Sequence, residues 1–304
     1  MRHIAIAGGS GLIGQHLTNL LLQNNNKVYI LSRNPDKISY KKGVVPIKWN
    51  VEKRTIDIDK LKNINGIINL SGANLSEKRW TKKRKEVLYN SRVLSTRFLY
   101  EEVKKNNIFL DFFVSTSAIG YYGTFTDNSI FYEDSPNGKD FLALLCKDWE
   151  DESLKFKSIS KRVVILRTGV VFSNKGGALP KIIFPIRYFV GGPIGSGKQI
   201  VPWIHIDDIS RMFLFAIETN LNGIYNAVVS EEEQPNNKVL GQTIAKLLKK
   251  PFVFPNIPGF MLKLLLGEMA KLLLEGNKVS NKKILKKNFI YKYGQLEKAL
   301  EDLL

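Results

Sequence analysis

The chain has 304 residues with ordinary hydrophobic (44%) and charged (24%) fractions, which fits a globular α/β protein with one large domain and a smaller lobe and excludes a fibrous or low-complexity protein. The lone cysteine, Cys146, excludes an intrachain disulfide, no zinc-ligand spacing predicts a metal site, and no apolar run reaches the roughly 18 residues of a membrane-spanning helix. The net charge of +18 comes from lysines scattered along the chain, so a generally positive surface that attracts anionic ligands is favoured over a nucleic-acid site.

The first 33 residues predict a dinucleotide-binding unit. Residues 4–7 form a short apolar run, typical of a buried parallel strand, and residues 27–31 predict a second strand. Between them, apolar residues at helical spacing predict a helix that starts at residue 12. The turn between the first strand and this helix is rich in glycine. This order of strand, glycine turn, helix and strand is the context in which such a motif binds a dinucleotide.

Three glycines have separate roles in this turn. Gly8 allows a sharp turn off the strand, Gly11 removes a side chain where the backbone approaches a pyrophosphate, and Gly14 lets the helix lie close to the sheet. The phosphates then meet N–H groups at the helix N-terminus. The alternative is a glycine-rich turn without a ligand. The predicted cofactor contacts in this unit are Gly8, Ser10, Gly11, Leu12, Ile13 and Gly14.

The end of the second strand favours NADP(H) over NAD(H). NAD sites generally carry an acidic residue there, which binds the ribose 2′-hydroxyl. This chain has Ser32 and Arg33 instead. A guanidinium group and a hydroxyl suit a 2′-phosphate, with its charge and its bidentate geometry. The alternative is an arginine on a solvated loop.

The rest of the chain predicts a Rossmann-type, doubly wound parallel sheet. Further strands are expected at residues 44–49, 66–70, 110–115, 162–166 and 223–229, with long helices at 81–106 and 141–156. Ligands of such a sheet bind outside the carboxyl ends of its strands. The strand ends therefore add candidate cofactor contacts at Leu70, Ser71, Gly72 and Thr116.

Two domains are expected. Residues 1–172 are predicted to form the NADP(H)-binding domain, whose sheet is completed by parts of 203–229, and residues 173–304 mostly form a smaller substrate lobe. In that lobe, Asp207 or Asp208 is expected to cap a helix that runs to about residue 218. The apolar stretch around Gly267 predicts a helix pair rather than a helix lying on a membrane surface.

Several motifs spread over essentially the whole chain resemble one known family. It is the epimerase family, an atypical branch of the short-chain dehydrogenase/reductases that is also described as NAD-dependent epimerase/dehydratase-like. The resemblance implies a Rossmann domain that binds NADP(H), with a smaller lobe over the cleft. The motifs are GGSGLIG at 8–14, NLSGANL at 69–75, SAIGYYG at 117–123, GGPIGSG at 191–197 and LEGNKV at 274–279.

The resemblance also implies roles for single residues. Ser32 and Arg33 match the contacts of the 2′-phosphate, and Leu70 and Ser71 match the wall on the adenylate side. Three positions come from the resemblance alone: Glu86 and Arg92 face the cofactor from the long helix, and Val170 contacts it near the nicotinamide end. The residues themselves equally allow Glu86 to belong to a surface ion pair.

One departure from the superfamily concerns catalysis. Its members use Tyr-x-x-x-Lys, in which the tyrosine is the general acid/base and the lysine lowers the tyrosine pKa. Aligned through Glu150, the tyrosine position is Leu142 and the lysine position is Cys146. Substitute catalytic candidates follow the strand at 110–115, with a wall that shapes the substrate as the alternative. They are Ser117, Tyr121 and Tyr122.

Two functions therefore remain open. The first is an NADP(H)-dependent oxidoreductase or nucleotide-sugar epimerase-like enzyme acting on a small carbonyl or alcohol. The second is a catalytically silent NADP(H)-binding or redox-sensing module, which the missing Tyr-Lys pair favours. Glycines interrupt the apolar start of the chain, so no signal peptide is predicted and a cytoplasmic location is expected. The expected partner is an unidentified small-molecule substrate, and the chain is a monomer or a homodimer.

Overall fold

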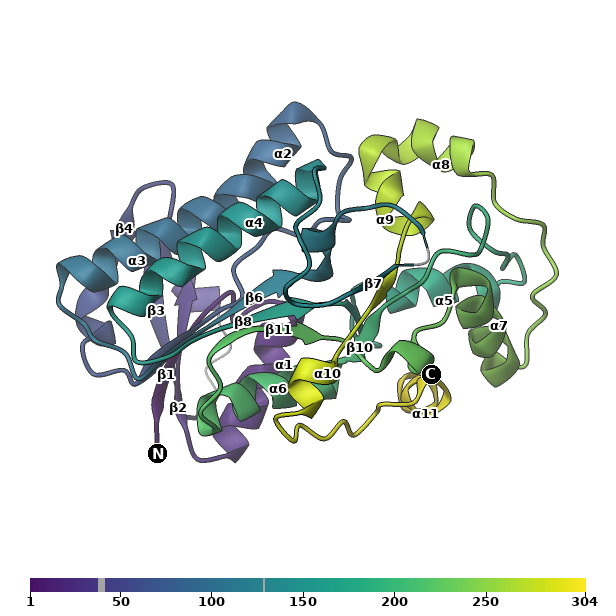
Figure 1. Cartoon of the computed structure of the whole chain (residues 1–304). Helices are drawn as coiled ribbons and strands as arrows, with labels where there is room; N and C mark the ends of the chain where they lie inside the picture. The colour runs from purple at the N-terminus through teal and green to yellow at the C-terminus, as the bar shows by residue number, and fades with distance from the viewer. Residues whose placement is uncertain (38–41, 128) are drawn as a thin grey trace.

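A parallel sheet organises the chain (Figure 1). The computed structural model describes residues 1–37, 42–127 and 129–304. Within them, eight strands lie in the order β11-β8-β6-β5-β1-β2-β3-β4, and every neighbouring pair is parallel except β3 and β4. The predicted Rossmann-type sheet is confirmed. Its strands are β1 His3–Ala7, β2 Lys27–Ser32, β3 Val44–Asn50, β4 Thr55–Ile56, β5 Gly66–Asn69, β6 Phe112–Ala118, β8 Val163–Thr168 and β11 Gly223–Ala227.

Helices cover both faces of this sheet (Figure 1). Helices α1 Leu12–Gln23 and α6 Ile206–Glu218 pack on one face, where Ile4 and Ile6 of β1 join their core. Helix α3 Ser95–Lys105 packs on the other face with Ala5 and Ala7. Successive side chains of a strand point to opposite faces, so a strand buried on both sides must be apolar throughout. This is why the short apolar run of β1 predicted a central parallel strand.

The long helix predicted at 81–106 is divided in the structure. It consists of α2 Lys82–Tyr89, a π-helical turn at Asn90–Leu94, and α3. Val87 of α2 is apolar but 41% exposed. The wider π-helical turn separates α2 from α3, so one helical period does not describe both. The next helix on this side, α4 Phe141–Leu154, begins as predicted and is capped by Asp140.

The C-terminal part of the chain packs beyond the carboxyl end of the sheet (Figure 1). Helices α5 Leu179–Arg187, α7 Asn237–Leu248 and α11 Leu296–Leu303 share one core. Two small parallel sheets join distant segments. They pair β9 Val170–Phe172 with β10 Trp203–His205, and β7 Ile130–Phe131 with β12 Lys278–Val279.

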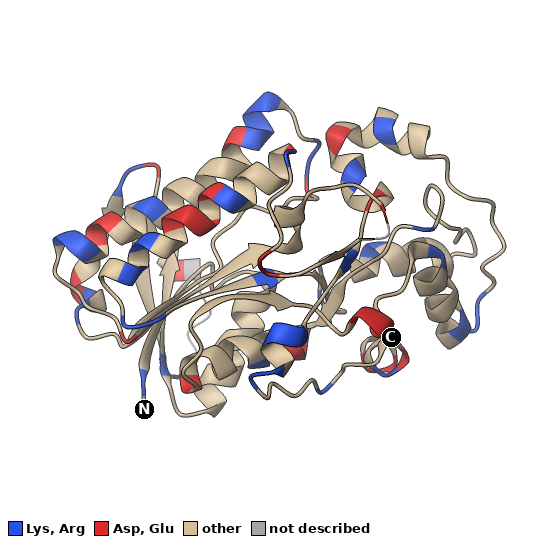
Figure 2. Ribbon diagram, in the orientation of Figure 1, with Lys and Arg blue, Asp and Glu red and all other residues tan. Residues whose placement is uncertain are grey.

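The predicted helix pair is present in the C-terminal part. Helix α8 Gly259–Leu266 and helix α9 Lys271–Leu274 are separated by a turn that starts at Gly267, whose φ is +62°. A short helix, α10 Lys282–Leu285, follows β12. None of the helices in the described ranges has the length and apolar character needed to cross a membrane. Lysines and arginines lie on many of the helices, with acidic residues among them (Figure 2).

Helix α6 is capped differently from the prediction. Its N-cap is His205, whose Nδ1 accepts the N–H of Asp207 at 3.1 Å, so neither Asp207 nor Asp208 is the cap. The buried carboxylate of Asp208 instead accepts the backbone N–H groups of Lys292 and Tyr293, each at 2.8 Å. Sequence reasoning chose the aspartates because they are preferred cap residues. The distant segment at 292–293 gives Asp208 its other role.

The His205 cap predicts a pH-dependent stability. Burial lowers the pKa of His205 below its ordinary value of 6.5, and a proton on Nδ1 would remove the acceptor of the cap. The unfolded chain therefore binds this proton more readily. The stabilisation is present above about pH 6.5 and is lost as the pH falls through that value towards the folded-state pKa.

Unfolding midpoints between about pH 5 and 8 test this expectation. His205→Asn keeps a cap acceptor but does not titrate, so its midpoint is expected to depend less on pH than that of the wild type. An identical pH dependence in both proteins would assign the effect to other groups, among them His16, whose pKa burial also lowers.

Candidate functional site

The glycine turn after β1 is tightly packed at two of its three motif positions. A Cβ on Gly8 would lie 2.5 Å from the carbonyl oxygen of Leu70, and one on Gly14 would lie 2.5 Å from that of Gly8. Gly8 also has a φ of +81°, which favours glycine. Gly11 differs, because its φ is −76° and a Cβ there would meet only the Gly8 oxygen, at 3.3 Å, among the described residues. The packing of the protein thus requires Gly8 and Gly14 but leaves space at Gly11.

This space lies at the N-terminus of α1. Gly11 is the N-cap, and no side chain caps the helix. Ser10 is exposed, and its carbonyl oxygen accepts a hydrogen bond from Gln15 of the first turn. Close by, the hydroxyl of Ser71 is buried and has no hydrogen-bond partner in the described part of the chain. Buried polar atoms in native proteins almost always have a hydrogen-bond partner, so this hydroxyl fits a ligand that would supply one.

The end of β2 carries a hydroxyl and a cation. Ser32 accepts the N–H of Asn34 through its Oγ at 3.1 Å. Arg33 is exposed and makes no hydrogen bond or ion pair with the residues that the structure describes. The next acidic residue, Asp36, lies in the short helical turn Pro35–Lys37 beyond the strand. The side chains of Ser32 and Arg33 therefore fit a phosphate group better than a ribose diol.

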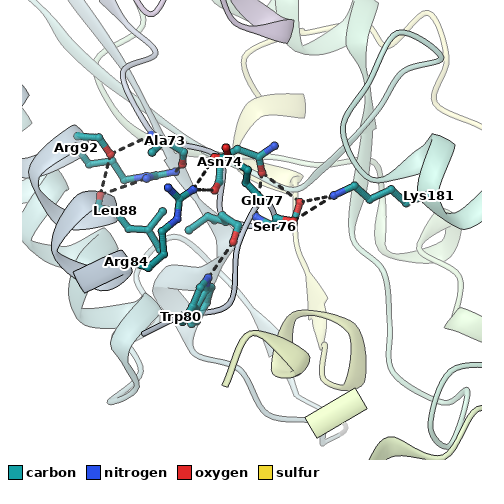
Figure 3. Close-up of polar contacts among 11 residues, drawn as sticks. Ala73, Asn74, Ser76, Glu77, Trp80, Arg84, Leu88, Arg92 and Lys181 are labelled. Atoms are coloured by element: carbon teal, nitrogen blue, oxygen red, sulfur yellow. Dashed lines mark hydrogen bonds and ion pairs between the residues drawn. The ribbon is translucent and has the colours of Figure 1, made fainter. Parts of the chain in front are cut away.

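Arg92 lies beside the loop that follows β5 (Figure 3). Its guanidinium donates to the carbonyl oxygens of Ala73 (3.0 Å) and Leu88 (3.3 Å) and packs over Trp149. A Cβ on Gly72 would lie 2.9 Å from its Cζ. Burial lowers the pKa of Arg92 to about 10, and none of the described carboxylates forms an ion pair with it. Arg92 is therefore a half-buried cation without an anionic partner among the described residues, whereas Glu86 is exposed on α2.

The loop at 73–77 is held from both sides (Figure 3). On the α2 side, Arg84 donates to the carbonyl oxygen of Asn74 and pairs with Glu77 at 2.9 Å. On the opposite side, Lys181 of α5 donates to the carbonyl oxygen of Ser76 at 3.2 Å. Leu75 lies between these contacts, and Trp80 donates to its carbonyl oxygen. The loop therefore links the Rossmann part to α5.

A cavity of about 280 Å³ lies at the carboxyl ends of β6 and β8, between the sheet and the C-terminal segment. Val170, predicted at the nicotinamide end, lines it. The hydroxyl of Thr116 lies 3.1 Å from that of Thr168, which is also in the wall. Sequence reasoning missed Leu75, Gln199 and the residues at 272–279, which reach the cavity only through folding. Apart from the family motifs that include Leu75 and part of 272–279, no sequence signal marked them.

Two of the three catalytic candidates belong to a buried polar network. Ser117 donates its hydroxyl to Glu150 at 2.7 Å, and Glu150 forms a buried ion pair with Arg167 at 2.9 Å. Tyr122 donates to Asn226 at 2.6 Å and accepts from Arg167 at 3.1 Å. Burial raises the pKa of Tyr122 to about 12, although Arg167 acts in the opposite direction. Both hydroxyls are thus bonded within the protein.

The third candidate, Tyr121, packs its ring against Arg167, with the guanidinium carbon 3.4 Å from the ring centroid. Of the three, Tyr122 alone lines the cavity. At the tyrosine position of the superfamily motif, Leu142 forms part of the cavity wall. At the lysine position, Cys146 is buried, and burial raises its pKa to about 12. In the described ranges, no cluster of three or more His, Cys, Asp or Glu could hold a metal.

Comparisons with known proteins agree on one family. The model of the NAD dependent epimerase/dehydratase family matches residues 4–228, and that of a domain of unknown function, DUF1731, matches residues 257–303. Epimerase family protein SAR0825 of Staphylococcus aureus (strain MRSA252) is 36% identical over 307 residues, which cover 100% of this chain and 99% of that protein.

Two solved structures are similar over the full chain. Human epimerase family protein SDR39U1 (isoform 2), in a crystal structure with NADPH, has 28% identity and a TM-score of 0.84, with 99% of this chain and 98% of that one covered. The nucleoside-diphosphate sugar epimerase of Corynebacterium glutamicum also has 28% identity, with a TM-score of 0.79, and covers 100% of this chain but 58% of its own.

Proposed function

The chain belongs to the NAD-dependent epimerase/dehydratase family, and we propose from this premise that it binds NADP(H) and uses it to interconvert a small carbonyl compound and its alcohol. The observation that carries the choice of cofactor is the end of β2, where Arg33 is exposed beside Ser32 and is not paired with any described residue. The NADPH in the human relative supports this choice.

In this proposal the pyrophosphate lies over Gly11, and its oxygens accept hydrogen bonds from the backbone N–H groups of Leu12 and Ile13 at the start of α1. The turn through Gly8, Ser10 and Gly14 shapes this place. Arg33 and Ser32 bind the 2′-phosphate. The open space at Gly11, with no side chain capping α1, supports this arrangement.

The strand ends hold the rest of the cofactor. Leu70 and Ser71 form the adenylate wall, and the unpaired hydroxyl of Ser71 supports a polar contact there. Arg92, which lies beside Gly72, supplies positive charge to this part of the site. Glu86 is exposed on α2, and no contact places it beside Gly72 among the described residues. Thr116 and Val170 contact the nicotinamide end.

The bound cofactor supplies or accepts a hydride, and the protein supplies a shielded place for the substrate. Tyr122 is the predicted catalytic side chain that lines the cavity, and it can serve the substrate oxygen only by exchanging its bond to Asn226. Ser117 and Tyr121 act on it indirectly in this proposal, through Glu150 and Arg167. They are therefore positioning residues.

Titration with NADPH and NADH tests the choice of cofactor. Arg33→Ala is expected to weaken NADPH binding by about 1.5–3 kcal/mol, or roughly 10–150-fold, and to leave NADH binding unchanged. Arg2→Ala is the matched control, because it removes the same charge from an exposed residue just before β1, at the amino ends of the strands, whereas Arg33 follows the carboxyl end of β2. Equal affinities of the wild type for both cofactors would contradict the preference, and no binding of either would contradict the proposal.

A second function is a binding module without turnover. The observation that favours it is Leu142 in the cavity wall, at the position where the superfamily places its catalytic tyrosine. This alternative predicts NADPH binding without oxidation of NADPH by any carbonyl compound. The first function predicts turnover that falls in Tyr122→Phe, with NADPH affinity retained.

A further inference from the structure

Among the described residues, the wall of the cavity carries no cation. Although lysine and arginine make up 46 of the 304 residues of the chain, none of them belongs to the described residues that line it. Its charged residue is Glu275. A diphosphate is normally bound by arginine, lysine or clustered backbone N–H groups, and a carboxylate repels it. The described wall therefore supplies no cation to a nucleoside diphosphate, and its charged residue, Glu275, opposes one.

Most polar side chains of the wall are already bonded within the protein. The carboxylate of Glu275 accepts the hydroxyl of Thr126 at 2.5 Å. Asn277 uses both ends of its amide, since it accepts the N–H of Asp127 and donates to the carbonyl oxygen of Phe125, each at 2.8 Å. Thr124 donates to Asp140 at 2.8 Å. A polar ligand would find few free partners here.

Gln199 is the exception. It is 2% exposed, and its Nε2 donates to the carbonyl oxygens of Ile194 at 3.0 Å and Leu273 at 2.7 Å. Its Oε1 is buried and has no partner within the described residues. These two acceptors fix the orientation of the amide, so the atom left without a described partner is the oxygen, which can only accept a hydrogen bond. A single O–H or N–H donor on a ligand would satisfy it.

The remaining wall is apolar and the space is small. The cavity is lined by the side chains of Leu75, Leu142, Leu272 and Val279 and by the rings of Tyr122 and Phe131. A volume of about 280 Å³ lies below the roughly 300–1,000 Å³ of pockets that hold drug-sized ligands. The nicotinamide expected at Val170 would reduce this space further.

We propose that the cavity takes a small, uncharged and largely apolar carbonyl compound, whose alcohol form donates its hydroxyl to Oε1 of Gln199, and that it does not take a nucleoside diphosphate sugar. This inference rests on the proposed NADP(H) function. In the reaction the carbonyl carbon gains a hydride from NADPH and its oxygen gains a proton that comes from solvent, while NADPH becomes NADP⁺. Oxidation of the alcohol is the reverse.

The test compares neutral ligands with a nucleotide sugar. The probes are a panel of aliphatic and aromatic ketones and alcohols of roughly six to ten carbon atoms, and UDP-glucose. Binding is measured as a shift of the melting temperature, with and without NADPH, and turnover as NADPH oxidation. Neutral alcohols are expected to raise the melting temperature, and UDP-glucose is expected to leave it unchanged.

Leu75→Trp provides the structural control. It adds a ring to the half-buried wall of the cavity and is expected to weaken the binding of the neutral ligands at least about tenfold. The matched variant Leu264→Trp changes a residue that is 74% exposed on α8 and is expected to have no effect. Leu264→Trp should bind NADPH as the wild type does, and the NADPH affinity of Leu75→Trp is measured beside its affinity for the neutral ligands.

The outcomes separate the two proposals. Binding or epimerisation of UDP-glucose overturns the inference, as does the absence of any shift across the neutral panel in a protein that binds NADPH. A wild type that binds neutral ligands but not NADPH overturns the proposed cofactor instead. Ligand shifts that Leu75→Trp leaves unchanged place the binding outside the cavity and overturn the inference.

Discussion

Replacement of Arg167 by methionine is expected to lower the free energy of unfolding by about 3–5 kcal/mol. Arg167 is 1% exposed and Glu150 is 3% exposed, and two hydrogen bonds of 2.9 Å join them. Arg167 also donates to the hydroxyl of Tyr122 and to the carbonyl oxygen of Glu133. Its loss leaves the carboxylate of Glu150 buried without a cation. An uncompensated buried charge costs far more than the ion pair contributes.

Two further variants make this prediction sharp. Arg167→Met combined with Glu150→Leu removes both charges, so the double variant is expected to recover most of the lost stability. Lys147→Met breaks the exposed pair between Lys147 and Asp151 on the same helix, and its expected cost is below about 1 kcal/mol. Urea unfolding measures all of these values. A single variant at Arg167 that costs no more than Lys147→Met would contradict the assignment.

The second large effect separates the two roles of glycine in the turn after β1. Gly11→Ala is expected to weaken NADPH binding at least about tenfold, equivalent to roughly 1.4 kcal/mol, with little loss of stability. The new methyl group meets a single protein atom at 3.3 Å, and the φ of −76° suits alanine. It would occupy the space through which the pyrophosphate approaches the backbone.

Gly14→Ala is the matched comparison. Its methyl group would lie 2.5 Å from the Gly8 oxygen and 2.6 Å from the Gly9 Cα, so it is expected to lower the melting temperature before any cofactor is added. Fluorescence titration with NADPH and thermal unfolding of both variants test this contrast. If Gly11→Ala bound NADPH as the wild type does, the pyrophosphate would have to lie elsewhere.

The strands, the helix and the glycine turn of the cofactor-binding half could be predicted because their patterns involve residues that are close along the chain. An apolar run that ends in glycine predicts a buried strand and a turn, and a change of period predicts a helix, so β1, α1 and β2 were all found. The requirement for Gly14 arises from Gly8 and Gly9 of the same motif, whereas that for Gly8 arises from Leu70 and Ser71, which follow the neighbouring strand β5. Ser32 and Arg33 could be identified from their position at the carboxyl end of β2.

Sequence alone did not decide how the catalytic candidates are used. Ser117 and Tyr122 lie where hydroxyls at a strand end were expected, but their partners are Glu150 on α4 and Asn226 on β11. These partners are distant in the chain, and no local pattern links them. In the same way, His205 caps α6, while Asp208 accepts backbone N–H groups of the distant segment at 292–293.

What the sequence determined by itself is therefore the fold, the family and the dinucleotide motif, because each depends on residues that are close along the chain. What only the tertiary structure decided is the cavity. Leu75, Leu142, Gln199 and the segment at 272–279 come from distant parts of the chain and form one wall. Whether a side chain is free to act depends on which distant groups pair with it, and folding alone determines those partners.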